Sequence, residues 1–280
     1  MSSASHCGAD ALSTARSLSS SSSARASAVP CYWSALSTTP TAPVAYELAS
    51  LAYSLGDTSS VERSLSLAVR VDPSFGEGYF ELGNVYFDQR RHAEAAHTFR
   101  ASLAARKPPR DLPMVHNNLA NVLSEVGDRE GAAREYEAGL RIAPTFPYLL
   151  NGAANLQAES GQLAEAASTL GTLLEAHPDA HYARHNRGIF LRGLKRWDEA
   201  ESELRAALAA KPIEPRYHQG LGVLLHTRAR RQEAMKSYRQ RAPQKAPLKT
   251  QKAPHTPICD PAVNLPCEMA RSAVISSDLR

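Results

Sequence analysis

The stretch GYFELGNVYFDQRRHAEAAHTFRASLAA, residues 78–105, contains the pattern that decides the fold. Its apolar residues recur at helical spacing on either side of the polar segment 88–92, which predicts two amphipathic helices joined by a short turn. Gly83 and Ala95 lie where we expect the two helices to approach closely, because a larger side chain at either position would push them apart. The stretch is therefore predicted to form a helical hairpin.

The same arrangement recurs along the chain at a fixed spacing. Pro144, Pro178 and Pro212 follow one another at intervals of 34 residues, and each closes one copy of the pattern. About six copies cover roughly 200 of the 280 residues. One copy cannot bury its apolar face alone, so neighbouring copies are expected to stack.

The period and the residue types point to a known repeat. The motif residues of the best copy are Tyr79, Leu82, Gly83, Tyr86, Ala95 and Phe99. They resemble the tetratricopeptide repeat, whose period is 34 residues. The resemblance implies an all-α solenoid, a right-handed superhelix of about six helix-turn-helix repeats that binds other proteins. Gly56, Gly127 and Gly161 fall at the turns inside the repeats, where we expect a positive φ.

Composition divides the chain into three segments. Residues 1–42 are rich in Ser, Ala and Thr, with Asp10 as their only acidic residue, so we expect either disorder or an organelle transit peptide. Residues 43–247 contain the repeats. Residues 248–280 form a basic segment with scattered prolines, which disfavour helix, so a disordered tail is expected.

Two positions depart from the repeat pattern. Residues 107–113 insert about three residues between the second and third copies, which predicts a local loop. Arg187 stands where the motif has Leu, which weakens the fifth copy.

Cysteine usage bears on the compartment. Cys7, Cys31, Cys259 and Cys267 all lie outside residues 43–247. Disulfides would be expected to staple the folded part, so a reducing compartment is the simpler expectation. A reducing compartment, together with the lack of an apolar run long enough to span a membrane, predicts an intracellular, cytoplasmic protein. The alternative is organelle targeting by the N-terminal segment.

The resemblance places the ligand on a concave face, which the first helix of each repeat lines. Mapping the motif onto this chain gives these candidate residues: Tyr46, Phe80, Asn84, Asp88, Asn117, Asn121, Glu125, Asn151, Asn155, Glu159 and His185. Asn84, Asn121 and Asn155 occupy one equivalent motif position. An amide can pair with both polar groups of a peptide backbone, so these three residues could form a ladder that holds an extended segment. Alternatively they are polar groups on a solvated surface.

Charge varies along the repeats. Residues 43–183 contain 11 Lys and Arg against 18 Asp and Glu, whereas residues 184–241 contain 14 against 6. The acidic part predicts a protein or peptide partner that is not acidic, although the charge could serve solubility instead. The arginine clusters could contact RNA, but without an ordered aromatic platform a nucleic-acid partner is not expected.

The sequence contains no recognisable catalytic motif. GxxxxGK[ST], HExxH and GxSxG are all absent, so we expect neither an enzyme nor a cofactor. His181 and His185 are spaced i,i+4 and could share a metal, but no third ligand is evident nearby, so a solvated edge of the binding face is favoured and no metal site is predicted.

We therefore predict a non-catalytic scaffold that binds an extended segment of a partner protein. The alternative is the substrate-recognition arm of a larger enzyme. The phrase His116-Asn117-Asn118-Leu119-Ala120 looks like the repeats of protein O-GlcNAc transferases and of O-mannosyltransferases that carry tetratricopeptide repeats. In those families the repeats present a protein substrate to a separate catalytic domain.

Overall fold

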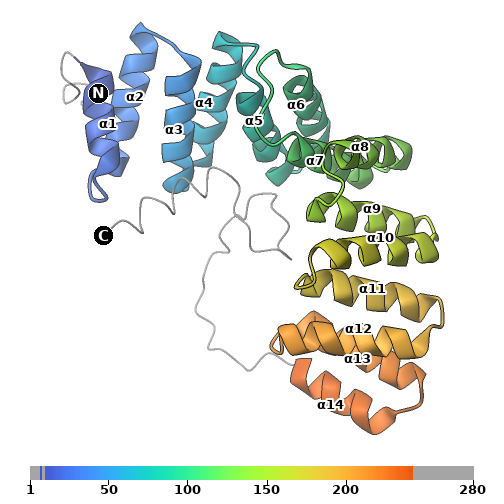
Figure 1. Cartoon of the computed structure of the whole chain (residues 1–280). Coiled ribbons are helices and arrows are strands. Elements are labelled where there is room, and N and C mark those ends of the chain that lie inside the picture. Colours follow the sequence, from blue (N-terminus) through green and yellow to red (C-terminus); the bar gives the residue numbers. More distant parts are fainter. Residues whose placement is uncertain (1–6, 8–9, 242–280) are drawn as a thin grey trace. The chain divides into compact units, whose positions relative to one another are not determined.

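The computed structural model describes residue 7 and residues 10–241, so the predicted tail at 248–280 lies outside the described residues. Fourteen α-helices and no strand occupy this part of the chain (Figure 1). They are α1 (Ala11–Ser20), α2 (Arg25–Thr38), α3 (Ala42–Ser54), α4 (Thr58–Val71), α5 (Gly76–Asp88), α6 (His92–Ala104), α7 (Leu112–Glu125), α8 (Arg129–Ile142), α9 (Pro147–Glu159), α10 (Leu163–Ala176), α11 (His181–Gly193), α12 (Trp197–Ala210), α13 (Pro215–Thr227) and α14 (Arg231–Arg241). The all-α repeat architecture predicted from the sequence is confirmed.

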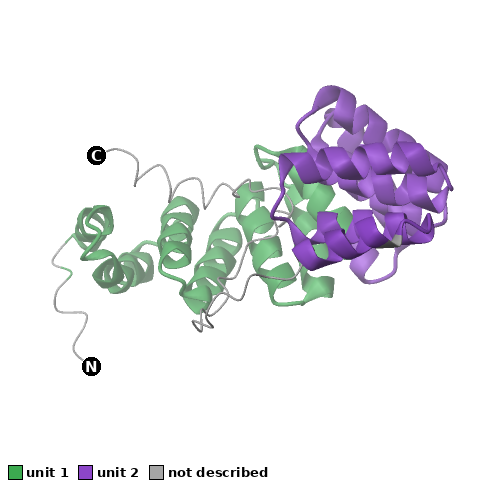
Figure 2. Ribbon diagram, turned by 90° about the horizontal axis from the view of Figure 1, so that it is seen from below, with its two compact units in different colours: residues 1–122, 255–280 green, residues 123–254 purple. Residues whose placement is uncertain are grey.

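The helices belong to two compact units, divided after Val122 inside α7 (Figure 2). In unit 1, α1 packs against α2, α3 against α4, and α5 against α6; these hairpins stack through α2 on α3 and α4 on α5. In unit 2, α9 pairs with α10, α11 with α12, and α13 with α14; α8 packs on α9, α10 on α11, and α12 on α13. Each unit is thus a stack of helical hairpins.

Small residues set the distance between the two helices of a hairpin, as predicted. A Cβ atom on Gly83 would lie 2.6 Å from the ring of Phe99, and one on Gly188 would lie 2.7 Å from Leu204. Ala95 on the second helix is fully buried. The apolar surface of each hairpin can interlock only because these positions have little or no side chain.

A left-handed residue ends the first helix of every repeat, two positions beyond the last helical residue. Gly56, Gly127 and Gly161 have the expected positive φ, between 72° and 84°. The equivalent positions in the other three repeats are Arg90, Lys195 and Ala229, with φ between 60° and 62°. Residues other than glycine adopt this conformation at a cost, so these three turns are locally strained.

Residues 107–111 of the inserted segment lie in a loop, as predicted, whereas Leu112 and Pro113 begin α7. This loop is tied to the turn before α5. The Gly76 N–H donates to the Lys107 carbonyl at 2.9 Å, and the Lys107 N–H donates to the Ser74 carbonyl at 3.0 Å. The Lys107 ammonium lies 2.8 Å from an Asp72 carboxylate oxygen. These contacts hold the pKa of Asp72 down at about 2, chiefly through the hydrogen bonds from Lys107 and Ser74.

The expectation of disorder was wrong for residues 11–38, which form α1 and α2. The Asp10 carboxylate caps α1 by accepting from the Ser13 N–H at 3.0 Å. Tyr32 and Leu36 of α2 are buried in a core that extends to α3. Average composition missed these helices because it does not register helical spacing: the buried residues of α2 share one face, and they are Ala28, Cys31, Tyr32, Ala35 and Leu36.

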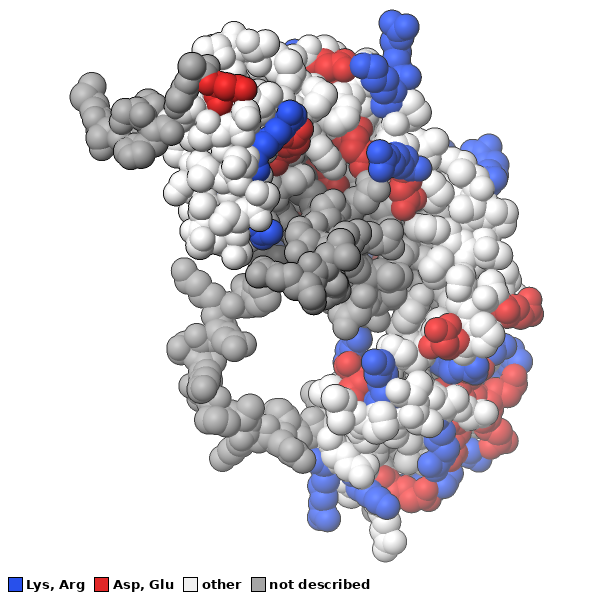
Figure 3. All heavy atoms as spheres, turned by 60° about the vertical axis from the view of Figure 1, so that its left-hand side comes forward, with Lys and Arg blue, Asp and Glu red and all other residues white. Residues whose placement is uncertain are grey.

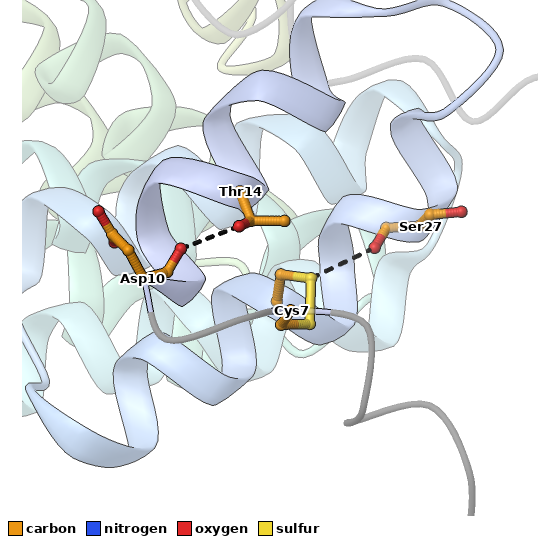
Figure 4. The surroundings of a disulfide bond; sticks show 5 residues. Cys7, Asp10, Thr14 and Ser27 are labelled. Atoms are coloured by element: carbon orange, nitrogen blue, oxygen red, sulfur yellow. Dashed lines mark hydrogen bonds between the residues drawn. A yellow bond between two sulfur atoms is a disulfide. The ribbon is translucent and has the colours of Figure 1, made fainter.

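The expectation that all four cysteines lie outside the folded part was wrong for two of them. Cys7 and Cys31 form a disulfide within unit 1, and both residues are almost fully buried, with 2% and 1% of their surface exposed (Figure 4). Two of the four cysteines therefore belong to the fold, and a disulfide is typical of oxidising surroundings. Cys259 and Cys267 lie outside the described residues.

Candidate partner-binding faces of the first helices

Three asparagines and one glutamate connect two first helices of unit 1 in what we term the amide relay: Glu81 and Asn84 on α5, and Asn117 and Asn118 on α7. The Asn84 amide donates to Glu81 Oε2 at 3.1 Å. Asn118 Nδ2 donates to Asn84 Oδ1 at 2.8 Å, and Asn117 Nδ2 donates to Asn118 Oδ1 at 3.1 Å. All four residues are buried, with at most 4% of their surface exposed. The relay therefore fixes the rotamers of these side chains from within the protein.

The relay changes the role expected for two candidate residues. Asn84 and Asn117 were predicted to meet a ligand directly, yet both already hydrogen-bond within the relay. Asn121, which shares the motif position of Asn84, is half-buried. Equivalent positions therefore have unequal exposure. Asn118 was missed, although its 34-residue separation from Asn84 was a signal that the two lie on neighbouring first helices.

Of the two candidate aromatic residues in unit 1, only one reaches the surface. Tyr46 on α3 is half-buried and packs edge-to-face with Phe75, with ring centroids 5.5 Å apart. Phe80 is buried, and its ring lies 6.1 Å from that of Phe99 on the second helix of the same hairpin. Phe80 therefore belongs to the core of the hairpin, and its assignment to the binding face is corrected.

The first helices of unit 1 have an acidic character. Neither α3 nor α5 contains Lys or Arg, whereas α5 contains Glu77, Glu81 and Asp88. Burial raises the pKa of Tyr53 on α3 to about 12, and the nearby charges of Asp88 and Glu81 contribute to the shift. Asp88 itself is exposed. The local field therefore favours cations.

A second amide pair connects first helices in unit 2. Asn186 Nδ2 on α11 donates to Asn151 Oδ1 on α9 at 3.1 Å. Asn151 is buried, with 8% of its surface exposed. His185 Nδ1 lies 3.3 Å from Asn186 Oδ1, so the candidate residues Asn151 and His185 are brought together through Asn186, which sequence reasoning missed.

Tyr217 on α13 connects the two histidines of α11. The His185 ring lies 4.8 Å from the Tyr217 ring, and His181 Nδ1 forms a 2.6 Å hydrogen bond with the Tyr217 hydroxyl. Burial lowers the pKa of both His181 and His185. The pair considered as metal ligands thus packs with an aromatic ring. Among the described residues no group of three or more His, Cys, Asp or Glu is placed to hold a metal.

The remaining candidates in unit 2 lie nearer the surface. Asn155 is half-buried, and Glu125 and Glu159 are exposed. A hollow of about 250 Å³ lies between α8, α9 and α10 and is lined mainly by apolar atoms, including those of Leu150 and Leu156. None of the candidate residues lines this hollow.

The arginine clusters of unit 2 are largely paired within the protein. Arg187 and Arg184 of α11 lie 2.6 and 3.4 Å from the Glu203 carboxylate of α12. Arg228 and Arg230 lie 3.2 and 2.8 Å from Glu201. Lys and Arg side chains accordingly lie among Asp and Glu side chains on the face of the protein shown in Figure 3. Arg187, which departs from the repeat motif, thereby connects the two helices of its hairpin.

The described fold and these faces define an α-helical repeat protein. Two family models, both described as tetratricopeptide repeat, match the chain, one at residues 123–184 and the other at residues 46–110 and 191–247. The chain belongs to the tetratricopeptide-repeat family. No curated protein sequence matches it.

Several solved structures share the fold. YrrB, described as a tetratricopeptide-repeat protein with an unusual peptide-binding site, is 20% identical with a TM-score of 0.56, over 71% of this chain and 97% of that chain. A tetratricopeptide-repeat protein from Parabacteroides merdae ATCC 43184 is 21% identical with a TM-score of 0.61, over 70% and 77% of the two chains. MamA (residues 41 to the end) from Desulfovibrio magneticus RS-1 is 16% identical with a TM-score of 0.53, over 61% and 93%. At these identities the similarity concerns the fold.

No helix in the described part of the chain combines the length and the apolar character needed to cross a membrane.

Proposed function

We propose that the chain is a non-catalytic interaction scaffold that binds an extended segment of a partner protein on the first-helix faces of its units. The observation that supports this most directly is the oriented amide system: the relay of unit 1 and the Asn151–Asn186 pair of unit 2. Buried amides with fixed rotamers can hold neighbouring half-buried groups in place, and preorganised groups bind at a lower entropic cost.

In this proposal the residues nearer the surface contact the partner and the buried ones position them. Tyr46 and Asn121 in unit 1, and Asn155 and His185 in unit 2, are half-buried and therefore accessible to a peptide. Asn84, Asn117 and Asn151 are positioning residues, because they are buried and bonded to other amides. YrrB, which has the same fold, carries a peptide-binding site by its description.

The partner segment is proposed to be neutral or basic where it meets unit 1. The first helices α3 and α5 carry no cationic residue, and α5 contains Glu77, Glu81 and Asp88. An acidic segment would meet like charge there, which costs binding energy and slows association.

The test is selection of peptides from a random displayed library on the full-length protein, followed by direct affinity measurements. We expect selected peptides to bind the Asn121→Ala/Asn155→Ala variant at least tenfold more weakly. The matched control is Gln232→Ala, which removes an exposed amide from the second helix α14 and should leave affinity unchanged. Equal affinity for the double variant and the wild type would refute the role of these amides.

The alternative function, a substrate-recognition arm of a protein O-glycosyltransferase, rests on the sequence resemblance alone. The mass of the protein purified from its natural source separates the two proposals. A mass near 30.3 kDa agrees with a free-standing scaffold, and a much larger one agrees with an arm of an enzyme.

A further inference from the structure

The disulfide between Cys7 and Cys31 lies in a helical hairpin that precedes the first tetratricopeptide repeat. Cys7 comes before α1 and Cys31 lies within α2, 24 residues further along the chain. Both residues are buried in the same apolar cluster as Ala15 of α1 and Ala28, Tyr32 and Leu36 of α2. The bond therefore joins the start of the hairpin to the centre of its second helix (Figure 4).

Apart from the disulfide, the hairpin is held by one buried face of α2 and by a few residues of α1, most of them only partly buried. α1 has ten residues, four of them serine, and buries only Ala15. An isolated helix of this length is marginal in water. α2 contains Pro30, which cannot donate the helical hydrogen bond expected at its position. The ion pair of Arg16 with Glu47 on α3 has exposed partners, so it adds little.

The hairpin covers an apolar face of the first repeat. Ala42, Val44, Ala45 and Leu48 of α3 are buried, and they belong to the cluster that contains the disulfide. Without α1 and α2 this face would meet water. The ends of stacked repeats need a cap for solubility, and the α1–α2 hairpin supplies it at this end of unit 1.

We propose that the α1–α2 hairpin is a redox-dependent cap, which oxidation of Cys7 and Cys31 locks onto α3 and which thiol–disulfide exchange releases. In the locking step the two thiols give up two electrons and two protons to an external disulfide, which becomes two thiols. In the reverse step a dithiol reduces the bond and is itself oxidised to a disulfide. A thiolate must reach a sulfur atom to exchange. Since both sulfurs belong to buried residues, release begins with local opening of the hairpin.

The proposal predicts that the redox state alters the hairpin and leaves the rest of unit 1 folded. Hydrogen exchange of the full-length protein, read by mass spectrometry, follows amides of residues 11–38 and of residues 58–104 separately. Dithiothreitol should speed exchange in residues 11–38 by about 10²-fold, the order expected when a loop of this length is no longer closed. Exchange in residues 58–104 should change less than threefold.

Two variants make the test specific. Cys7→Ala/Cys31→Ala should exchange fast in residues 11–38 and be insensitive to dithiothreitol. Cys259→Ala/Cys267→Ala should behave as wild type, because those cysteines lie outside the hairpin. A peptide map made without reduction, with free thiols blocked during lysis, should contain Cys7 linked to Cys31. Unlinked cysteines, or linked cysteines with unchanged exchange on reduction, would overturn the proposal.

Discussion

Replacement of Asn118 by alanine tests the amide relay directly. Asn118 is 1% exposed, and its amide donates to Asn84 Oδ1 and accepts from Asn117 Nδ2. The variant leaves one buried acceptor and one buried donor without these partners, and each unsatisfied group costs about 1–3 kcal/mol. We therefore expect the free energy of unfolding of unit 1 to fall by about 2–4 kcal/mol.

This loss is a large fraction of the 5–15 kcal/mol typical of a folded domain, so it is readily measured. Guanidinium titration monitored by circular dichroism gives the overall midpoint, and hydrogen exchange in α5 and in residues 112–122 assigns the loss to unit 1. The control is Asn155→Ala, which removes a half-buried amide from α9 and should cost less than about 0.5 kcal/mol.

A double-mutant cycle separates the hydrogen bond from the loss of two side chains. If Asn84 and Asn118 stabilise each other, the Asn84→Ala/Asn118→Ala variant should be destabilised by less than the sum of the two single variants, with a coupling of about 0.5–3 kcal/mol. Strict additivity, or a cost for Asn118→Ala no greater than that for Asn155→Ala, would refute the relay as a source of stability.

Three further predictions concern single groups. Ala229→Gly should raise the free energy of unfolding by about 0.5–1 kcal/mol in denaturant titrations, because φ at position 229 is 60°, whereas Ala206→Gly inside α12 should lower it by a similar amount. The Asp72 carboxyl should titrate by NMR with a pKa of about 2, and this pKa should move toward 3.8 in Lys107→Gln. The stability that the ionised Asp72 carboxylate adds is therefore present above pH 3.8 and is lost as pH falls through 2. The pKa of His185 should lie below 6.5 by NMR, because its partial burial disfavours the cation, and the stability that depends on the neutral ring should therefore decrease as pH falls below 6.5; a midpoint at or above 6.5 would contradict the packing of His185 on the buried Tyr217.

The repeat fold could be predicted because its determinants are local and recur. Gly83 faces Phe99, and Gly188 faces Leu204, in the same geometry one hairpin after another. The spacing of 34 residues repeats this steric requirement, so a single sequence reveals it. The left-handed turn was predicted only where glycine marks it. Arg90 adopts the same conformation without any residue-type signal, because the packing of the two helices imposes it.

The N-terminal hairpin could not be predicted from average composition. Serine-rich α1 buries a single alanine, and its attachment to the fold depends on a covalent bond between residues 24 positions apart. The pairing of Cys7 with Cys31 is a property of three-dimensional proximity. Four cysteines allow three pairings, and the sequence does not choose among them.

The sequence predicted which helices form the candidate face, but it predicted only some of the residues on that face. The motif register correctly assigned Asn84 and Asn151 to first helices, but whether an amide faces a partner or a neighbouring helix depends on the side chain opposite. Asn118 lies opposite Asn84, and Asn186 lies opposite Asn151, so both candidates are occupied within the protein. Periodicity identifies positions, whereas hydrogen-bond partners follow from distances that differ from repeat to repeat.

The same reasoning applies to charge. The excess of Lys and Arg in residues 184–241 suggested a basic surface, yet Arg187 is paired with Glu203 and Arg230 with Glu201. A net count therefore overstates the charge available to a partner there. On α3 and α5 of unit 1 every charged residue is acidic, although Glu47 of α3 is paired with Arg16 of α1, so we expect electrostatic selection of a partner to depend mainly on α5. If so, an Asp88→Asn substitution should weaken binding of a basic peptide and reduce its salt dependence, whereas Arg192→Gln in unit 2 should alter neither.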